Sequence, residues 1–269
     1  MNPVHVIQGE GPIILAMPHT GTWLPDDVHV DLNARGKDLA DTDWHIDRLY
    51  DGLLSGATIV RANFHRYVID ANRDPTGASL YPGQNTTGLV PLTDFDGAPI
   101  WTNSPDEAAI AARRDAFHAP YHEALAGEMA RVSAAHGLAV LYDCHSIRSR
   151  IPFLFDGLLP DFNIGTNDGT TCAPEIEATA LRTCSAADNF ATVLNGRFKG
   201  GWTTRHYGRP REGWHAIQME LSQRTYLAAE AAPWTYAPHK AERVRNAFRT
   251  LLADLDRFAR AAAPERFSA

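Results

Sequence analysis

Short apolar runs alternate with amphipathic stretches along the chain. The runs that predict buried strands are residues 13–17, 57–60, 67–70, 138–142, 151–155 and 215–221. Between several of these runs, apolar residues recur every three or four positions, which is typical of helices with one buried face. Strands that alternate with helices predict an α/β fold, with a mixed, mostly parallel sheet flanked by helices.

Four stretches predict helices. Residues 106–136 and 240–263 are the two longest and most regular. Residues 174–187 form a third, because Pro174 stands just inside the start, where proline is favoured. Residues 43–54 form a short fourth helix, for which Asp41 or Thr42 is the expected N-cap.

Long turn-rich stretches separate these elements, at residues 74–99, 155–174 and 194–213. Loops of this length inside a compact domain usually carry function. No change of composition marks a linker, and 269 residues are enough to bury a large core. We therefore predict a single catalytic domain over residues 1–269.

Composition narrows the classes of protein to consider. A net charge of −7 argues against a nucleic-acid-binding protein, which needs an excess of lysine and arginine. No apolar run is long enough to span a bilayer, so we expect no membrane partner. The N-terminus lacks the pattern of a signal peptide, and the three cysteines show no CxxC spacing. We therefore expect a cytoplasmic protein without disulfides.

Two histidines stand where predicted strands end. His19 follows the run at residues 13–17, and His145 follows the run at residues 138–142. Catalytic groups gather at the carboxyl ends of strands in open α/β sheets, and neutral imidazole is the commonest protein ligand for transition metals. The pair indicates half of a metal site, although either histidine could instead be a hydrogen-bonded core residue.

A metal-dependent hydrolase also needs a third ligand and a carboxylate base. Asp43 and Asp47 lie four residues apart on the short predicted helix, so either can point back at the strand end. Stabilisation of the helix dipole is the alternative interpretation of both. Glu220 lies near the end of the last apolar run, where burial would raise its pKa and suit it to act as a general base. The alternative is a structural, paired glutamate.

Arginines are concentrated in the turn regions. They are Arg66, Arg73, Arg148, Arg150, Arg205, Arg209 and Arg211. Guanidinium groups bind carboxylates through paired hydrogen bonds, so this pattern favours an anionic substrate, although most of these residues taken singly fit surface ion pairs. A cysteine nucleophile at Cys144 is disfavoured, because neighbours on a strand point to opposite faces and Cys144 could not work with His145.

Several segments carry a family resemblance when they are taken in order. They are residues 18–21 (PHTG), 41–50 (DTDWHIDRLY), 71–75 (ANRDP), 143–149 (DCHSIRS), 198–208 (FKGGWTTRHYG) and 218–223 (QMELSQ). Together they resemble the N-formylglutamate amidohydrolase family, and residues 68–73, 145–146 and 219–221 resemble signatures of the wider zinc carboxypeptidase-like superfamily. The resemblance implies a phosphorylase/hydrolase-like sheet and a zinc enzyme of histidine degradation. Its expected substrate is a small dicarboxylate, N-formyl-L-glutamate, hydrolysed to formate and L-glutamate.

The resemblance also implies roles for individual residues. His19 and His145 would bind zinc, and Glu220 would be the base that activates water. Arg66 would stabilise the oxyanion. The expected substrate-binding residues are Asn72 and Arg73 for one carboxylate, and Arg148 or Arg205 for the other.

The chain departs from the carboxypeptidase pattern at one position. Carboxypeptidases carry an acidic ligand three residues after the first histidine, where this chain has Thr22. The acidic ligand must come from elsewhere, and we expect Asp47 rather than Asp43. Such a site would also accept cobalt, manganese or iron. Two other functions fit the residues: deacylation of another N-acyl amino acid, and binding of an amino acid without catalysis. The sequence predicts no oligomeric state.

Overall fold

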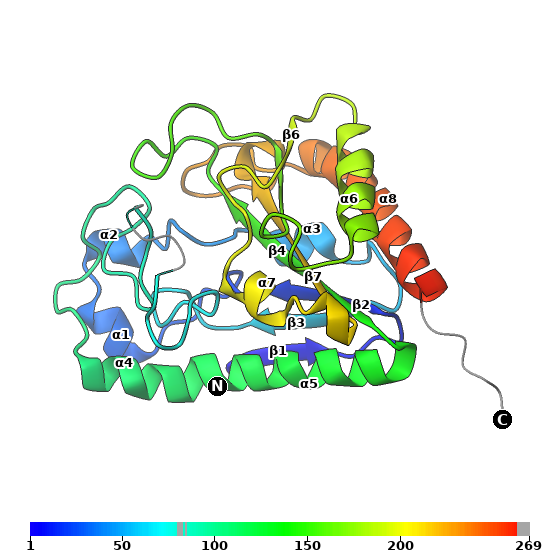
Figure 1. The fold of residues 1–269 in the computed structure, drawn as a ribbon. Coiled ribbons are helices and arrows are strands. Elements are labelled where there is room, and N and C mark those ends of the chain that lie inside the picture. Colours follow the sequence, from blue (N-terminus) through cyan, green and yellow to red (C-terminus); the bar gives the residue numbers. More distant parts are fainter. Residues whose placement is uncertain (80–82, 84, 263–269) are drawn as a thin grey trace.

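The computed structural model describes residues 1–79, 83 and 85–262, and Figure 1 shows a central sheet with helices packed on both faces. Seven strands follow the order β1-β3-β2-β4-β7-β5-β6. They are β1 (Val4–Ile7), β2 (Ile13–Met17), β3 (Thr58–Ala62), β4 (Ala139–Ile147), β5 (Phe162–Gly165), β6 (Thr192–Leu194) and β7 (Trp214–Ser222). The β1–β3 and β5–β7 pairs are antiparallel and the other neighbouring pairs are parallel, which confirms the predicted mixed, mostly parallel sheet.

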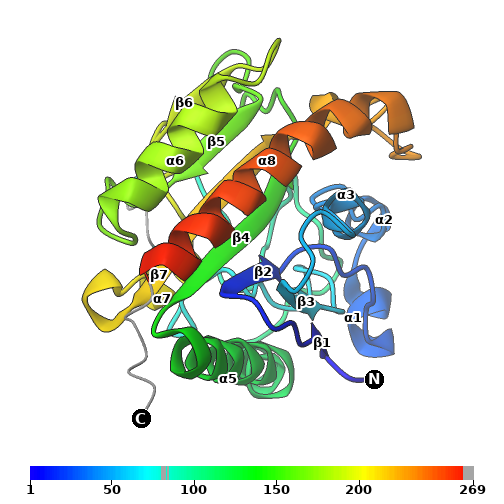
Figure 2. The same cartoon turned by 90° about the vertical axis from the view of Figure 1, so that its right-hand side faces the viewer.

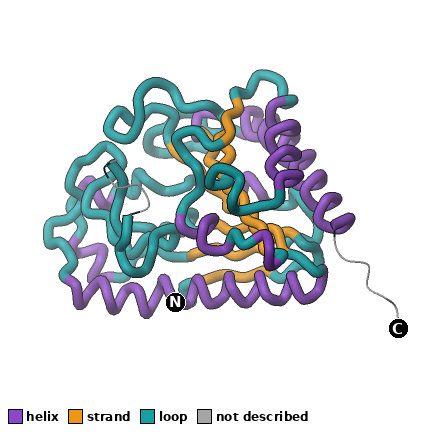
Figure 3. Tube along the Cα trace, viewed as in Figure 1, coloured by secondary structure: helices purple, strands orange, loops and turns teal. Residues whose placement is uncertain are grey.

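The helices form layers on the two faces of this sheet. They are α1 (Asp26–Asp31), α2 (Ala34–Lys37), α3 (Ile46–Tyr50), α4 (Glu107–Arg113), α5 (Ala119–His136), α6 (Pro174–Ser185), α7 (Trp202–Tyr207) and α8 (Pro238–Ala262). Figure 2 shows α5 on one face of the sheet and α6 and α8 on the other. Loops form much of the left and upper parts of Figure 3. None of the described helices is long and apolar enough to cross a membrane.

Strand β2 shows how the sequence pattern builds both faces of the core. Its residues are all buried, and Ile13, Leu15 and Met17 pack with residues of α3, α6 and α8. Ile14 and Ala16 pack on the opposite face with residues of α5. Successive side chains of a strand point to opposite faces, and a largely parallel sheet buries both of them. The run is therefore apolar throughout.

The same alternation places polar groups at the carboxyl ends of β4 and β7. In β4, Tyr142 and Cys144 belong to the core on the α8 face, so Asp143 and His145 point to the other face. Cys144 contacts the carbonyl oxygen of Tyr142 through its sulfur at 3.5 Å, and burial raises the pKa of its thiol well above the ordinary range. The structure therefore supports the argument against a cysteine nucleophile.

Two predicted strands are wrong. Residues 67–70 are buried but form turns, in which the Tyr67 N–H donates to the ring of His65 and the Asp70 N–H donates to the Leu89 carbonyl. The segment is apolar because it is buried, and its pattern therefore resembles that of a buried strand, although none of the described strands pairs with it. Residues 151–155 form a helical turn instead, because Pro152 has no N–H to offer a sheet.

The short helix expected over residues 43–54 covers only Ile46–Tyr50. His45, rather than Asp41 or Thr42, precedes it, and its φ of 60° lies in the left-handed region. Asp43 therefore lies outside the helix, and its N–H donates to the His19 carbonyl at 3.0 Å. This break decides which aspartate reaches the site.

The other predicted helices are found close to their expected bounds. A π-helical turn, Arg114–His118, joins α4 and α5 into one continuous helical stretch over the predicted range. Helix α6 agrees with the prediction for residues 174–187, and α8 with the prediction for residues 240–263, except that residue 263 lies outside the described residues. The β1, β5 and β6 strands were not predicted, because they are only three or four residues long.

Candidate active site

Three donor side chains meet beside the carboxyl ends of β2 and β4. Oδ2 of Asp43 lies 3.2 Å from Nδ1 of His145 and 3.7 Å from Nδ1 of His19. All three residues are buried, and one ligand atom from each lies within 4.8 Å of the others. Burial alone would raise the pKa of Asp43, but its hydrogen bond with His145 and the nearby ring of His19 outweigh burial and lower the pKa to about 2. The cluster therefore presents a carboxylate between two imidazoles.

A second carboxylate stands behind each imidazole. Nε2 of His19 lies 2.7 Å from Oδ1 of Asp70, and Nε2 of His145 lies 3.0 Å from Oδ1 of Asp143. A carboxylate that accepts the proton of one ring nitrogen leaves the lone pair of the other for a metal, and it fixes the orientation of the ring. Nδ1 of both histidines therefore faces Asp43, and the hydrogen bond of His19 with Asp70 leaves the Nδ1 lone pair of His19 for a metal.

These residues fit a divalent cation. Nδ1 of His19 is buried and makes no hydrogen bond to any described residue, which is costly for a polar atom unless another partner binds it. Two imidazole nitrogens and one carboxylate oxygen form a donor set that suits zinc in catalytic sites, with a position left for water. Cobalt, manganese and iron accept similar ligands, so the donors do not select one metal.

The structure favours Asp43 over Asp47 as the partner of the two histidines. The Asp47 side chain is 42% exposed and pairs with Arg61 at 2.8 Å, whereas the Asp43 side chain is 2% exposed. Asp47 belongs to the first turn of α3, which is the dipole-stabilising position considered above. Within the described part of the chain, Asp43 joins the two histidines and Asp47 does not.

Glu220 faces His145 across the β4–β7 pair and lines the same cavity, which has a volume of about 370 Å³. Burial raises the pKa of its carboxyl group to about 8, although the nearby His145 opposes this shift. A carboxylate with a pKa near neutrality can accept and return a proton at working pH. The expectation that burial would raise the pKa of Glu220 agrees with the structure.

Gln218 positions the carboxyl group of Glu220, a role that sequence reasoning missed. Its Oε1 accepts a hydrogen bond from the Gly201 N–H at 2.7 Å. The orientation of the amide is therefore fixed, and its Nε2 donates to Oε2 of Glu220 at 3.2 Å. Gln218 and Glu220 are two residues apart on β7, so their side chains point to the same face of the sheet. This spacing is visible in the sequence and could have indicated the role of Gln218.

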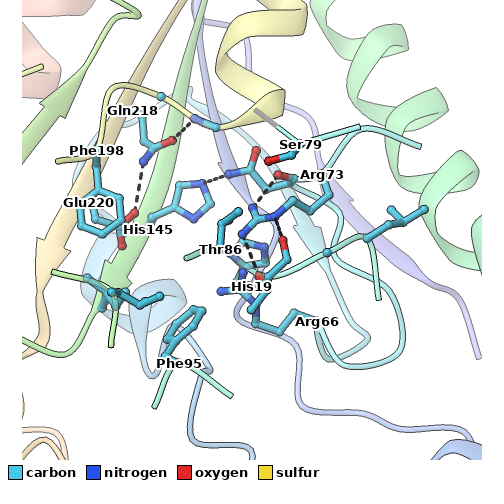
Figure 4. A pocket seen from close by; sticks show the side chains of 18 of the residues that line it. His19, Arg66, Arg73, Ser79, Thr86, Phe95, His145, Phe198, Gln218 and Glu220 are labelled. Atoms are coloured by element: carbon cyan, nitrogen blue, oxygen red, sulfur yellow. Dashed lines mark hydrogen bonds between the residues drawn. The ribbon is translucent and has the colours of Figure 1, made fainter. Parts of the chain in front are cut away.

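Arg66 and Arg73 line the opposite side of the cavity. Figure 4 shows them near His19, with Gln218, Glu220 and Phe198 across the cavity. Both arginines pair with the buried Asp70: Nη2 of Arg66 donates to its Oδ2, and Nη1 of Arg73 lies 3.7 Å from the same atom. Burial alone would raise the pKa of Asp70, but the arginines outweigh burial and hold it well below the usual range.

Asn72 connects the His–Asp–His cluster to the start of α7. Its Oδ1 accepts a hydrogen bond from the Thr203 N–H at 2.9 Å, and its Nδ2 lies 3.1 Å from Nε2 of His145. Gly201 lies so close that a Cβ there would collide with the Asn72 amide, which explains a glycine at this point. Asn72 and Arg73 thus enter the cavity as expected.

The other two arginines expected at the substrate do not line this cavity. Arg148 pairs with Asp96 at 3.0 Å, and Nε of Arg205 donates to the Gly200 carbonyl at 3.0 Å. Among the described residues that line the cavity, the arginines are Arg66, Arg73 and Arg197. Arg197 was not singled out from the sequence.

Two histidines of the α5 region hold the backbone of the segment that carries Asn72 and Arg73. Nε2 of His118 donates to the Arg73 carbonyl at 2.9 Å, and Nε2 of His122 donates to the Ala71 carbonyl at 2.8 Å. Burial, with a smaller effect of neighbouring His118, lowers the pKa of His122 to about 3. His122 is therefore neutral in the folded protein.

We expect acid to destabilise the protein partly through His122. An unfolded histidine binds a proton below about pH 6.5, whereas folded His122 does so only near pH 3. The unfolded state therefore binds more protons between these values, and the free energy of unfolding falls as the pH drops, by roughly 1 to 2 kcal/mol at pH 5. Urea unfolding of the wild type and of His122→Gln, which keeps a donor but does not titrate, measures this effect at pH 8 and pH 5. Equal losses in the two proteins would contradict the assignment.

Comparisons with known proteins identify relatives of this chain. The family model described as N-formylglutamate amidohydrolase matches residues 11–227. A Pseudomonas aeruginosa protein named N-formylglutamate deformylase is 46% identical over 251 residues, or 92% of this chain and 94% of that protein. A Pseudomonas putida protein of the same name is 43% identical and covers 92% and 93% of the two chains. The crystal structure of N-formylglutamate amidohydrolase from Ralstonia eutropha JMP134 has a TM-score of 0.78 at 26% identity, and the match covers 96% of this chain and 99% of that one.

Proposed function

Because the chain belongs to the N-formylglutamate amidohydrolase family, we propose that it hydrolyses N-formyl-L-glutamate to formate and L-glutamate. One structural observation supports this proposal independently of the family. A buried carboxylate base, Glu220, lines one cavity together with a His–Asp–His cluster and arginines that can bind an anionic substrate. This combination is what hydrolysis of an amide in a dicarboxylate requires.

We propose zinc as the cofactor, held by His19, Asp43 and His145. When bound, the cation supplies Lewis-acid activation of water and of the formyl carbonyl group. The enzyme would act in histidine degradation in the cytoplasm, as the resemblance and the cysteine pattern led us to expect.

Glu220 is the residue that moves the proton. Its carboxylate accepts a proton from the attacking water and later delivers it to the nitrogen of the leaving glutamate. Gln218 holds the carboxylate by donating to Oε2, and the Gly201 N–H holds Gln218 in turn. The base therefore needs little rearrangement between the two transfers.

Arg66 is suited to the developing oxyanion. Its side chain is buried, its Nε makes no hydrogen bond to any described residue, and Asp70 fixes its other end. A preorganised donor of this kind stabilises the transition state more than the substrate. Arg73 and Asn72, which are held by His118 and Thr203, are placed to bind one substrate carboxylate.

We expect kcat/KM for N-formyl-L-glutamate to exceed the values for N-acetyl- and N-succinyl-L-glutamate by about 100-fold or more, because the larger acyl groups need more room beside the His–Asp–His cluster. The measurement is release of L-glutamate by the zinc-loaded protein from the three substrates under identical conditions. Similar or higher values for a larger acyl group would support the alternative deacylase. Binding of N-formyl-L-glutamate without any release of formate would support the non-catalytic alternative.

A further inference from the structure

Arg197 lines the active-site cavity from the loop that follows β6. Its Nε donates to the Leu154 carbonyl at 3.1 Å, and its Nη2 donates to the Asn85 carbonyl at 3.4 Å. The guanidinium carbon lies 5.6 Å from the centre of the Phe198 ring. Two of these contacts come from other segments and the third from the neighbouring Phe198, and together they fix the orientation of the guanidinium group.

Arg73 is held by the same short loop segment as Arg197. Nε of Arg73 donates to the Thr87 carbonyl at 2.9 Å, and its Nη2 donates to Oγ1 of Thr87 at 2.9 Å. Asn85 and Thr87 are two residues apart, and two residues of chain span at most about 7 Å. The two guanidinium groups are therefore anchored to points a few ångströms apart.

The two arginines nevertheless belong to different walls. In Figure 4, Arg73 lies on the side of Ser79 and Thr86. Phe198 lies on the side of Glu220, and the guanidinium group of Arg197 is close to the Phe198 ring. Arg73 pairs with Asp70, which lies beside the His–Asp–His cluster, whereas Arg197 donates to the Leu154 carbonyl. The cavity thus has two cationic positions separated by a short distance.

We infer that Arg197 binds the side-chain carboxylate of the substrate, while Arg73 binds its main-chain carboxylate. This inference rests on the proposed function. Glutamate carries two carboxylates on a chain of three carbons, so it needs two cationic groups a few ångströms apart, and guanidinium groups match carboxylates in shape and charge. Arg197 takes the role that the sequence had suggested for Arg148 or Arg205, and it selects a dicarboxylic N-formyl amino acid over neutral ones.

The test compares two substrates of nearly equal size, N-formyl-L-glutamate and N-formyl-L-glutamine, which differ in the side-chain charge. In the Arg197→Met variant, we expect kcat/KM for N-formyl-L-glutamate to fall about 100-fold, and the value for N-formyl-L-glutamine to change less than about threefold. Arg197→Lys should keep part of the preference, because it keeps the charge but loses the paired geometry. Arg249→Met, at an exposed position of α8, is the matched control and should retain the wild-type preference.

Equal losses for both substrates, or no loss for either, would overturn the inference. If the wild type hydrolyses neither substrate, the proposed function fails, and calorimetry then tests Arg197 separately. Wild type and Arg197→Met binding N-formyl-L-glutamate with equal affinity would also overturn the inference. Thermal unfolding of each variant shows whether it is folded.

Discussion

Replacing Glu220 by glutamine is expected to lower kcat for N-formyl-L-glutamate by about 10³-fold, because a general base contributes between about 10² and 10⁴ to the rate. Glutamine has nearly the same shape as glutamate but cannot accept the proton of the attacking water. Substrate binding should change little, since Arg73 lies on the other side of the cavity. The measurement is steady-state kinetics of the zinc-loaded variant at pH 8.

Two controls separate loss of the base from loss of the site. Elemental analysis should find the same metal content in Glu220→Gln as in the wild type, because Glu220 is not one of the three clustered donors. Glu123→Gln, the same substitution at an exposed position of α5, should leave kcat unchanged. Turnover by Glu220→Gln within a few-fold of the wild type would overturn the assignment of the base.

Replacing Asp43 by alanine is expected to weaken zinc binding by at least about 100-fold and to remove activity, since even residues behind the ligands change affinity by 10- to 100-fold when replaced. Asp43 is the anionic member of the cluster and lies between the two imidazoles. Competition with a chelator of known zinc affinity measures the dissociation constant. Removing the metal from the wild type with a chelator should abolish activity, and added zinc should restore it.

Asp47→Ala is the matched variant for this experiment, because Asp47 is the aspartate that the sequence favoured. It should keep zinc affinity and activity and lose less than about 1 kcal/mol of stability, from an exposed ion pair and the dipole of α3. The opposite result, with zinc lost from Asp47→Ala and kept by Asp43→Ala, would restore the prediction made from the sequence.

The sequence predicted the parts of the fold that follow from periodicity. Strands β2, β4 and β7 are fully or almost fully buried, so their apolar runs were plain, and the polar residues that end them led to His19, His145 and Glu220. The family resemblance then ordered these residues into a site. The edge strand β1 was too short and too exposed to stand out.

What the sequence could not predict depends on single backbone angles and on contacts across the chain. The choice of Asp47 assumed a regular helix from Asp43, and the left-handed conformation of His45 breaks that helix. Asp70 was assigned to a strand because its neighbours are apolar, although the segment forms turns. The position of Arg197 follows from loop contacts with Leu154 and Asn85, which no local pattern indicates.

The buried carboxylate of Asp70 has a consequence for the order and strength of binding. Its Oδ1 accepts hydrogen bonds from both the His19 ring and the Asn72 N–H, and its Oδ2 contacts Arg66 and Arg73. One side chain therefore contacts both a proposed metal ligand and the arginines proposed to bind the substrate. A ligand bound at either position changes the electrostatic interaction between Asp70 and the groups at the other position. With the proposed metal and substrate bound, we therefore expect thermodynamic linkage through this residue, in which each changes the affinity of the other by the same factor.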